Sequence, residues 1–259
     1  RQLKQMKKTG IKSIILTVGV ICLLLVAGYF IRQNSHVRFK DENMGIVICN
    51  TIGHGVTPET VLYKDLEDVS WLDTGYLGYY ETLVDIGKCR NVEVIVLNGN
   101  SYERHASYEV THNEVGRVLT EEEVMRVESE LAQIVPKLRK LEVFSFADMK
   151  SNCNIQNWDF ISRCSNLREI SIEDSSATDY SFLEELTDIK EIDLWGSQIS
   201  TADSLINLQD PMRLCIYDTP LAENEEEIQK LCEALPNTEI LISGDRVENE
   251  QHWDLHEYL

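Results

Sequence analysis

The chain has none of the short signatures that mark the common enzyme classes. It lacks the G-x-S-x-G turn of serine hydrolases, the glycine-rich P-loop and the H-E-x-x-H helix of zinc proteases. Its seven cysteines include no C-x-x-C pair, which gives a zinc cluster little support. Neighbouring carboxylates are expected from 44 acidic residues and do not indicate acid–base catalysis. The sequence therefore predicts a protein that is not an enzyme, with no metal and no cofactor.

Histidine offers one pair to consider, His252 and His256, which would share one face of a helix in the C-terminal tail. Asp254 and Glu257 lie beside them, but no third ligand follows on the same rigid element. A zinc site needs three or four ligands held in fixed geometry. We therefore interpret the pair as solvated tail residues.

Acidic residues are missing from the first 40 positions, where 8 of the 24 basic residues lie. The rest of the chain holds 16 basic and 44 acidic residues and has a formal charge of −28. Such a charge excludes non-specific binding of nucleic acid and predicts repulsion by anionic lipid. The solubility of a surface-displayed domain is the simplest explanation of this charge.

Charge is also missing from residues 13–31, an apolar run long enough to cross a bilayer as a helix. Five basic residues precede it, and positive charge stays on the cytoplasmic side. We therefore predict a cytoplasmic basic segment (1–12), a transmembrane signal anchor (13–31) and an extracellular C-terminal domain on a single-pass protein of the cell membrane. A cleaved signal peptide is the alternative, with 26–28 as a weak cleavage site.

The most informative pattern is a repeat of 22 residues between positions 167 and 216. The three units read Leu167-Arg-Glu-Ile-Ser-Ile, Ile189-Lys-Glu-Ile-Asp-Leu and Pro211-Met-Arg-Leu-Cys-Ile. The L-x-x-L-x-L spacing at a fixed period is the sequence signature of leucine-rich repeats. Each unit holds a short strand and a return segment, and stacked units bury one continuous core. The predicted fold is an α/β solenoid, a leucine-rich repeat horseshoe with a parallel concave sheet.

The same pattern extends in both directions with longer steps. Strands are expected at Val92, Leu141 and Ile240, and one more strand in the interval between Val92 and Leu141. Within that interval, 98–118 reads as a polar excursion. A capping box at Thr120 then opens a helix that runs to about Leu138. A second helix is expected around 226–235.

Residues 37–61 carry a second resemblance. They read V-R-F-K-D-E-N-M, then an apolar helix that ends at Gly53-His54-Gly55, then T-P-E-T-V as a second helix start whose apolar spacing continues to Leu72. With the 22-residue period, this arrangement resembles bacterial internalin-like proteins over about residues 37–245. The resemblance implies a helical N-terminal cap and a solenoid that binds macromolecules without catalysis. We thus expect a linker and cap at 32–72, repeats at 73–245 and an acidic tail at 246–259.

Two cysteines take apolar positions of the repeat. Cys89 and Cys164 each stand three residues before a strand start, where Leu186 and Leu208 stand in later units. Cysteine behaves there as a small core hydrophobe. We expect mostly free, buried thiols in the domain.

Strand alternation predicts the binding face. The third, fifth and seventh positions of each unit point away from the core, to the concave side. The predicted ligand-binding residues there are Glu169, Ser171, Glu173, Glu191, Asp193, Trp195, Arg213 and Tyr217. Carboxylates would steer a basic or mixed-charge partner, and exposed aromatic residues would anchor it. The alternative is that these positions follow the acidic average, with the aromatics supporting neighbouring strands.

The expected function is a cell-surface module for a protein or glycan ligand, with the membrane contacted through 13–31 and no role for nucleic acid. A different class stays open because the chain begins with Arg1. In that alternative the domain is the extracellular regulatory or sensor portion of a larger membrane protein, whose enzymatic or signalling part precedes Arg1.

Overall fold

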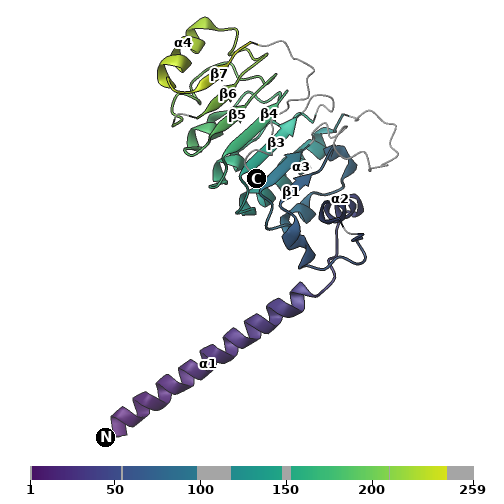
Figure 1. Ribbon diagram of the computed structural model, residues 1–259, viewed down its shortest axis with the longest axis vertical. Coiled ribbons are helices and arrows are strands. Elements are labelled where there is room, and N and C mark those ends of the chain that lie inside the picture. Colours follow the sequence, from purple (N-terminus) through teal and green to yellow (C-terminus); the bar gives the residue numbers. More distant parts are fainter. Residues whose placement is uncertain (1, 54, 98–117, 148–152, 210, 244–259) are drawn as a thin grey trace.

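The computed structural model describes residues 2–53, 55–97, 118–147, 153–209 and 211–243, with side chains from Thr17 onward. The first element, α1 (Gln2–Gln33), is one long helix that projects from the end of the molecule where the first strand lies (Figure 1). No helix in the described ranges is both long enough and apolar enough to cross a membrane. The membrane anchor at 13–31 stays a prediction.

Seven parallel strands form one sheet, and their order in space is their order in the sequence. The strands are β1 (Trp71–Asp73), β2 (Val94–Leu97), β3 (Val143–Ala147), β4 (Glu169–Glu173), β5 (Glu191–Asp193), β6 (Arg213–Cys215) and β7 (Glu239–Leu241). Parallel neighbours that follow one another in sequence require a return segment after each strand. This repeated strand and return is the arrangement of a leucine-rich repeat solenoid, so the predicted solenoid with a parallel sheet is confirmed.

The pairing register of the strands confirms the 22-residue repeat of the sequence. Glu169, Glu191 and Arg213, which stand 22 residues apart, are paired Cα neighbours on β4, β5 and β6. The prediction of one more strand between Val92 and Leu141 is wrong for this sheet, because β2 pairs directly with β3 and no strand lies between them in the sheet. That interval instead contains the helix α3 (Glu121–Ile134).

One strand went unrecognised in the sequence. The apolar spacing through Leu66, Val69 and Leu72 predicts a continuing helix, but only the short 3-10 turn η1 (Asp65–Asp68) forms. Trp71–Asp73 then pairs with β2 as β1. All three apolar residues are buried, as they would be in a helix too. The chain forms a strand here because its backbone hydrogen-bonds to β2, and this tertiary pairing outweighs the local helical pattern.

The return segments are short turns and two helices. The 3-10 turns are η2 (Leu77–Tyr79), η3 (Val84–Lys88), η4 (Val135–Lys137), η5 (Asp159–Arg163) and η6 (Ser181–Glu185). The predicted capping box is present: the Thr120 hydroxyl accepts from the Glu123 amide, and the Glu123 carboxylate accepts from the Thr120 amide. The helix ends at Ile134 and continues as η4, which contains Pro136. The last helix, α4 (Glu225–Ala234), matches its prediction.

The core is a ladder of inward side chains. One rung is contributed by each strand, and the fourth positions of the units are Ile95, Phe144, Ile170, Ile192 and Leu214, each at most 1% exposed. Phe144, Phe146, Trp158 and Phe160 form an aromatic cluster with ring centroids 4.9–6.1 Å apart. Burial of one such side chain stabilises the fold by about 1.5–3 kcal/mol.

The segment before β1 contains the predicted first helix, α2 (Glu42–Ile52), which ends at Gly53 and packs against β1. Asp41 caps it, since its carboxylate accepts from the Met44 amide and also from the amides of Glu81 and Thr82. The same carboxylate therefore joins the helix to the turn before η3. The role of this segment as an N-terminal cap, and the domain boundaries around it, stay predictions.

The predicted burial of Cys89 and Cys164 is confirmed, at 0% and 8% exposure. Cys49, Cys153 and Cys215 are buried as well, whereas Cys22 and Cys232 are exposed; all seven are free thiols. Residues 98–117 of the excursion predicted at 98–118, the tail at 246–259 and both tail histidines lie outside the described residues.

Candidate functional site on the binding face of the sheet

The binding face is the side of the sheet formed by the third, fifth and seventh positions of the repeats. Equivalent positions of neighbouring strands form rows with a spacing of about 4.8 Å. From β2 to β7 the first row contains Val94, Val143, Glu169, Glu191, Arg213 and Glu239, and the second contains Val96, Ser145, Ser171, Asp193, Cys215 and Leu241. The rows are apolar or neutral at β2 and β3, and charge begins at β4.

The carboxylates on this face differ from the prediction in their accessibility. Glu173, Glu191 and Asp193 are only 7%, 7% and 4% exposed, and Glu169 alone of the four is half-buried. The physical reason is local hydrogen bonding: Glu173 accepts from the Ser171 hydroxyl at 3.0 Å, and Asp193 accepts from the Trp195 amide at 2.9 Å. Three of the four carboxylates expected to face a ligand are therefore turned toward their own strand or a neighbouring one.

Arg213 connects three strands of the face. Its Nη1 lies 3.4 Å from Oε2 of Glu191 on β5, and its Nε lies 3.3 Å from Oε2 of Glu239 on β7. The Glu191 side chain is only 10% exposed, whereas those of Arg213 and Glu239 are 43% and 61% exposed. Arg213 thus neutralises the charge of the nearly buried Glu191 carboxylate. Glu239 is the accessible acid of the first row.

The two aromatic residues of the face lie side by side at the ends of β5 and β6. Backbone hydrogen bonds from Leu194 to Cys215 and from Gly196 to Tyr217 join these segments beyond the strands. Trp195 and Tyr217 are both half-buried. The indole Nε1 of Trp195 donates to Oδ2 of Asp218 at 2.9 Å, which holds the ring in one orientation. This pair is the part of the predicted site that the structure brings together.

A left-handed turn after each of β4, β5 and β6 sets this geometry. Asp174, Gly196 and Asp218 stand at equivalent positions 22 residues apart and have φ of 53°, 66° and 54°. A Cβ on Gly196 would collide with the carboxylate of Asp174, whose Cγ lies 3.1 Å from that position. Glycine therefore allows both the backbone angle and the close approach of the preceding repeat.

Burial shifts the pKa of three titratable groups on this face. Burial, followed by the charge of Glu191, raises the pKa of the Glu169 carboxyl. Burial and then Asp193 raise the pKa of the Cys215 thiol, so that this group stays protonated and is no nucleophile. Burial, followed by Cys215 and then Glu239, also raises the pKa of the Tyr217 hydroxyl. Neither Cys215 nor Tyr217, which are titratable groups among the described residues of this face, is activated as a nucleophile.

Sequence reasoning missed Asp218 and Glu239 as members of this site. A signal for Asp218 was available, because a partly buried indole N–H requires an acceptor and Asp218 follows Gly196 by one period. Glu239 gave a weaker signal, since the insertion that contains α4 disturbs the 22-residue spacing before β7.

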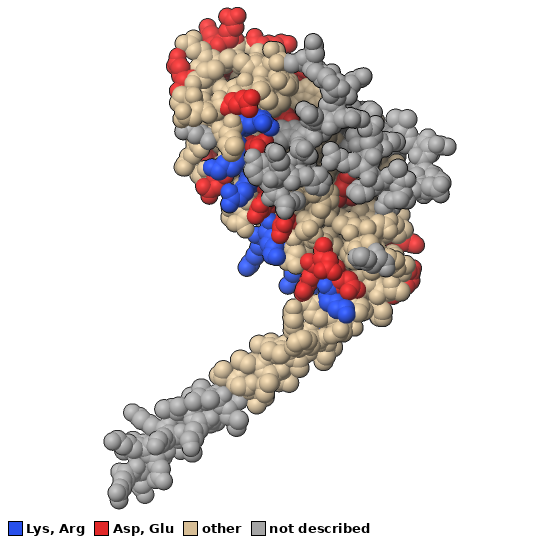
Figure 2. All heavy atoms as spheres, in the orientation of Figure 1, with Lys and Arg blue, Asp and Glu red and all other residues tan. Residues whose placement is uncertain are grey.

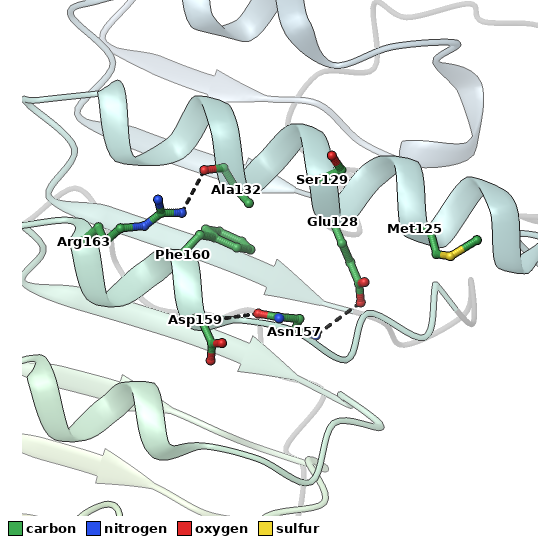
Figure 3. A pocket seen from close by; sticks show the side chains of 8 residues that line it. All are labelled: Met125, Glu128, Ser129, Ala132, Asn157, Asp159, Phe160 and Arg163. Atoms are coloured by element: carbon green, nitrogen blue, oxygen red, sulfur yellow. Dashed lines mark hydrogen bonds between the residues drawn. The ribbon is translucent and has the colours of Figure 1, made fainter.

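A shallow groove of about 370 Å³ lies on the opposite side of the repeats, between α3 and η5 (Figure 3). Its polar groups are used in joining these elements. Glu128 accepts from the amides of Gln156 and Asn157 at 2.6 and 3.2 Å, and Arg163 donates to the Ala132 carbonyl at 2.9 Å. Nowhere in the described ranges do three His, Cys, Asp or Glu side chains gather in an arrangement that could hold a metal ion.

Comparison with known proteins gives limited similarity. No protein-family model matches the chain, and no curated protein matches it. Among solved structures, internalin C2 from Listeria monocytogenes is 14% identical with a TM-score of 0.45, over 78% of this chain and 83% of that one. A leucine-rich repeat protein from Leptospira interrogans is 17% identical with a TM-score of 0.36, over 61% and 38% of the two chains. The internalin InlF from Listeria monocytogenes is 15% identical with a TM-score of 0.31, over 80% and 76%. With all three scores below 0.5, the solenoid assignment rests on the strand register.

Proposed function

We propose that this chain is a non-catalytic binding module displayed at the cell surface, and that it binds a protein partner through Trp195 and Tyr217 with help from accessible carboxylates. The observation that carries the proposal is the pair of half-buried aromatic rings on adjacent repeats, one of them fixed by Asp218. Trp and Tyr are enriched among residues that dominate interface energies. A ring held in place before binding loses less conformational entropy when the partner arrives.

The carboxylates around the rings indicate a partner with basic groups. Glu239 is 61% exposed, Glu169 is half-buried, and Arg213 is already paired with Glu191 and Glu239. A lysine or arginine of a partner beside Glu239 would meet an accessible negative charge. Such charges accelerate association and select the partner more than they increase affinity.

A random-peptide phage library provides the test, because no ligand has to be known beforehand. Selection on the wild-type chain should enrich peptides rich in Lys and Arg, and Trp195→Ala should weaken their binding by about 2 kcal/mol or more. Trp195→Phe, which keeps an aromatic ring but removes the hydrogen bond to Asp218, should lose less. Glu239→Lys should chiefly slow association at low salt. Equal binding by wild type and Trp195→Ala, with the fold intact, would refute the proposal; Trp195-dependent retention on a glycan array would move the ligand to sugars.

Anchoring in a membrane is the second part of the proposal. It is supported by the uncharged run 13–31, the basic residues before it, and the exposure of apolar side chains along α1, among them Leu23, Leu25 and Ile31 at 70%, 69% and 73%. Protease added to intact cells should remove the repeats. Protection of the repeats would contradict an extracellular domain.

A further inference from the structure

The N-terminal ends of the strands form an edge of the solenoid where basic side chains gather. We name it the basic edge and define it by the basic residues that closely precede β2 to β5: Arg90, Lys137, Arg139, Lys140, Arg168 and Lys190. Figure 2 shows Lys and Arg atoms in a broken line along that margin, with Asp and Glu atoms between them. Such an edge is unexpected on a domain whose formal charge is −28.

These six cations are available to a partner. Five of them are exposed and Lys190 is half-buried. Among the described residues, none of the six lies in an ion pair with a carboxylate, in contrast to Lys88, which pairs with the buried Asp85. Four carboxylates, Glu93, Glu142, Glu185 and Asp188, lie over the same stretches, so the six cations leave the edge with a small net positive charge.

Pairing of neighbouring strands brings edge residues that are distant in sequence side by side in a row. The amide of Lys190 donates to the Arg168 carbonyl and that of Arg168 donates to the Glu142 carbonyl, each at 2.7 Å. Arg168 and Lys190 therefore stand on adjacent strands, about 4.8 Å apart along the edge. Glu142 is the next residue of this row, before β3, and Glu93 follows it before β2. Lys140 and Arg139 stand two and three residues before Glu142, so the cations border the row over four strands with carboxylates among them.

The direction of α1 indicates what this line faces. In Figures 1 and 2, α1 leaves the solenoid on the side where the basic edge lies, and runs across the direction in which the strands stack. Its end is fastened to the segment before β1: the Tyr29 hydroxyl and the Gln33 amide donate to Glu67, and the Arg32 guanidinium lies 5.0 Å from the Tyr63 ring centroid. A bilayer entered by α1 would therefore extend along the basic edge.

We propose that the basic edge rests on anionic lipid headgroups of the membrane that α1 enters, an inference that depends on the anchoring proposed above. The net charge of the domain predicts repulsion, but fields in physiological salt decay over about 8 Å, so the charges nearest the surface decide the contact. Each Lys or Arg close to an anionic bilayer contributes about 1 kcal/mol, or about fivefold in partitioning. The contact would hold the repeats against the bilayer, and the binding face would then point along the membrane surface.

The test compares partitioning of the full chain into phosphatidylcholine vesicles with and without added phosphatidylglycerol. Arg168→Gln combined with Lys190→Gln should lower the ratio of the two partition coefficients by about fivefold for each cation removed. The matched control is Val118→Glu combined with Met125→Glu, which changes net charge equally at two exposed positions beside and on α3. The control ratio should stay within about twofold of wild type, and high salt should abolish the difference between the variants.

The outcomes separate the two proposals. Failure to partition into neutral vesicles would refute the anchor. If the chain partitions into neutral vesicles but the edge variant and the control variant have the same ratio of partition coefficients, the role of the basic edge is refuted. A third arm measures retention on immobilised heparin: loss of retention by the edge variant, with an unchanged vesicle ratio, would assign the edge to a soluble polyanion and overturn the lipid contact. Both substituted edge residues make no side-chain hydrogen bond or ion pair within the described residues, and the thermal unfolding of each variant checks that the fold is intact.

Discussion

The turn at Gly196 should be the most sensitive backbone position of the binding face. Replacement of Gly196 by Ala places a Cβ on a residue with φ of 66°, which costs about 1–2 kcal/mol in the left-handed region. The new methyl group also displaces the Asp174 carboxylate, whose Cγ lies 3.1 Å from its position. Loss of the local contacts of that carboxylate adds about 1 kcal/mol. The expected decrease in the free energy of unfolding is thus about 2–3 kcal/mol.

Gly87 is the matched control within the same chain. It lies in the 3-10 turn η3, and a Cβ there would meet Ile134 at an ordinary contact distance of 3.7 Å. Gly87→Ala should be neutral or stabilising by up to about 1 kcal/mol, because it restricts the unfolded chain without straining the folded one. Urea unfolding followed by circular dichroism measures both variants under one set of conditions.

A double-mutant cycle separates the two causes. Asp174→Gly removes the carboxylate that a methyl group on Gly196 would displace, so Gly196→Ala on that background should cost only the backbone strain of about 1–2 kcal/mol. If Gly196→Ala is as stable as Gly87→Ala, the left-handed turn is not a constraint and the reasoning is wrong. If the cost is unchanged on the Asp174→Gly background, the close approach of the two repeats contributes nothing.

Two further predictions follow from the buried titratable groups. Burial raises the pKa of Cys49 and Cys164 to about 11 and that of Cys89 to about 12. Native protein at pH 8 should therefore react with a thiol reagent at the exposed Cys232, and these three thiols should stay unmodified until the protein unfolds. Rapid reaction of Cys89 in the native protein would contradict its burial. Because the folded pKa of Glu169 is raised, its contribution to stability is fully present below the unfolded pKa and is lost as pH rises through the folded pKa. Glu169→Gln should therefore stabilise the protein at neutral pH, with a gain that disappears on acidification; urea unfolding of wild type and variant at both pH values measures the difference.

The repeated strands could be predicted because each apolar position is repeated by its neighbours at one period. Three units in one register were enough to predict the pairing of Glu169, Glu191 and Arg213 from their spacing. β1 escaped because its step to β2 departs from the 22-residue period that revealed the equally short β5 and β6, and because Leu72 fits a helix as well as a strand. Its state is decided by pairing with β2, a contact distant in sequence.

The accessibility of the binding face could not be predicted in the same way. Strand alternation places Glu173 and Asp193 on that face, but their rotamers turn toward donors at Ser171 and Trp195, and the repeat pattern carries no rotamer information. The basic edge was hidden for another reason. Arg90 and Lys140 are separated by a long insertion, and they join one row only because β2 pairs directly with β3.

Site-specific cross-linking tests the central claim, that the binding face around Trp195 and Tyr217 receives the partner. A benzophenone amino acid would replace Tyr217 on this face or Glu185 in the exposed turn η6, and each variant would be irradiated with a peptide selected on the wild-type chain. Position 217 should give a cross-linked product that excess unlabelled peptide suppresses, and position 185 should give none. A product from position 185 with none from position 217 would place the partner on the return segments and refute binding at Trp195 and Tyr217.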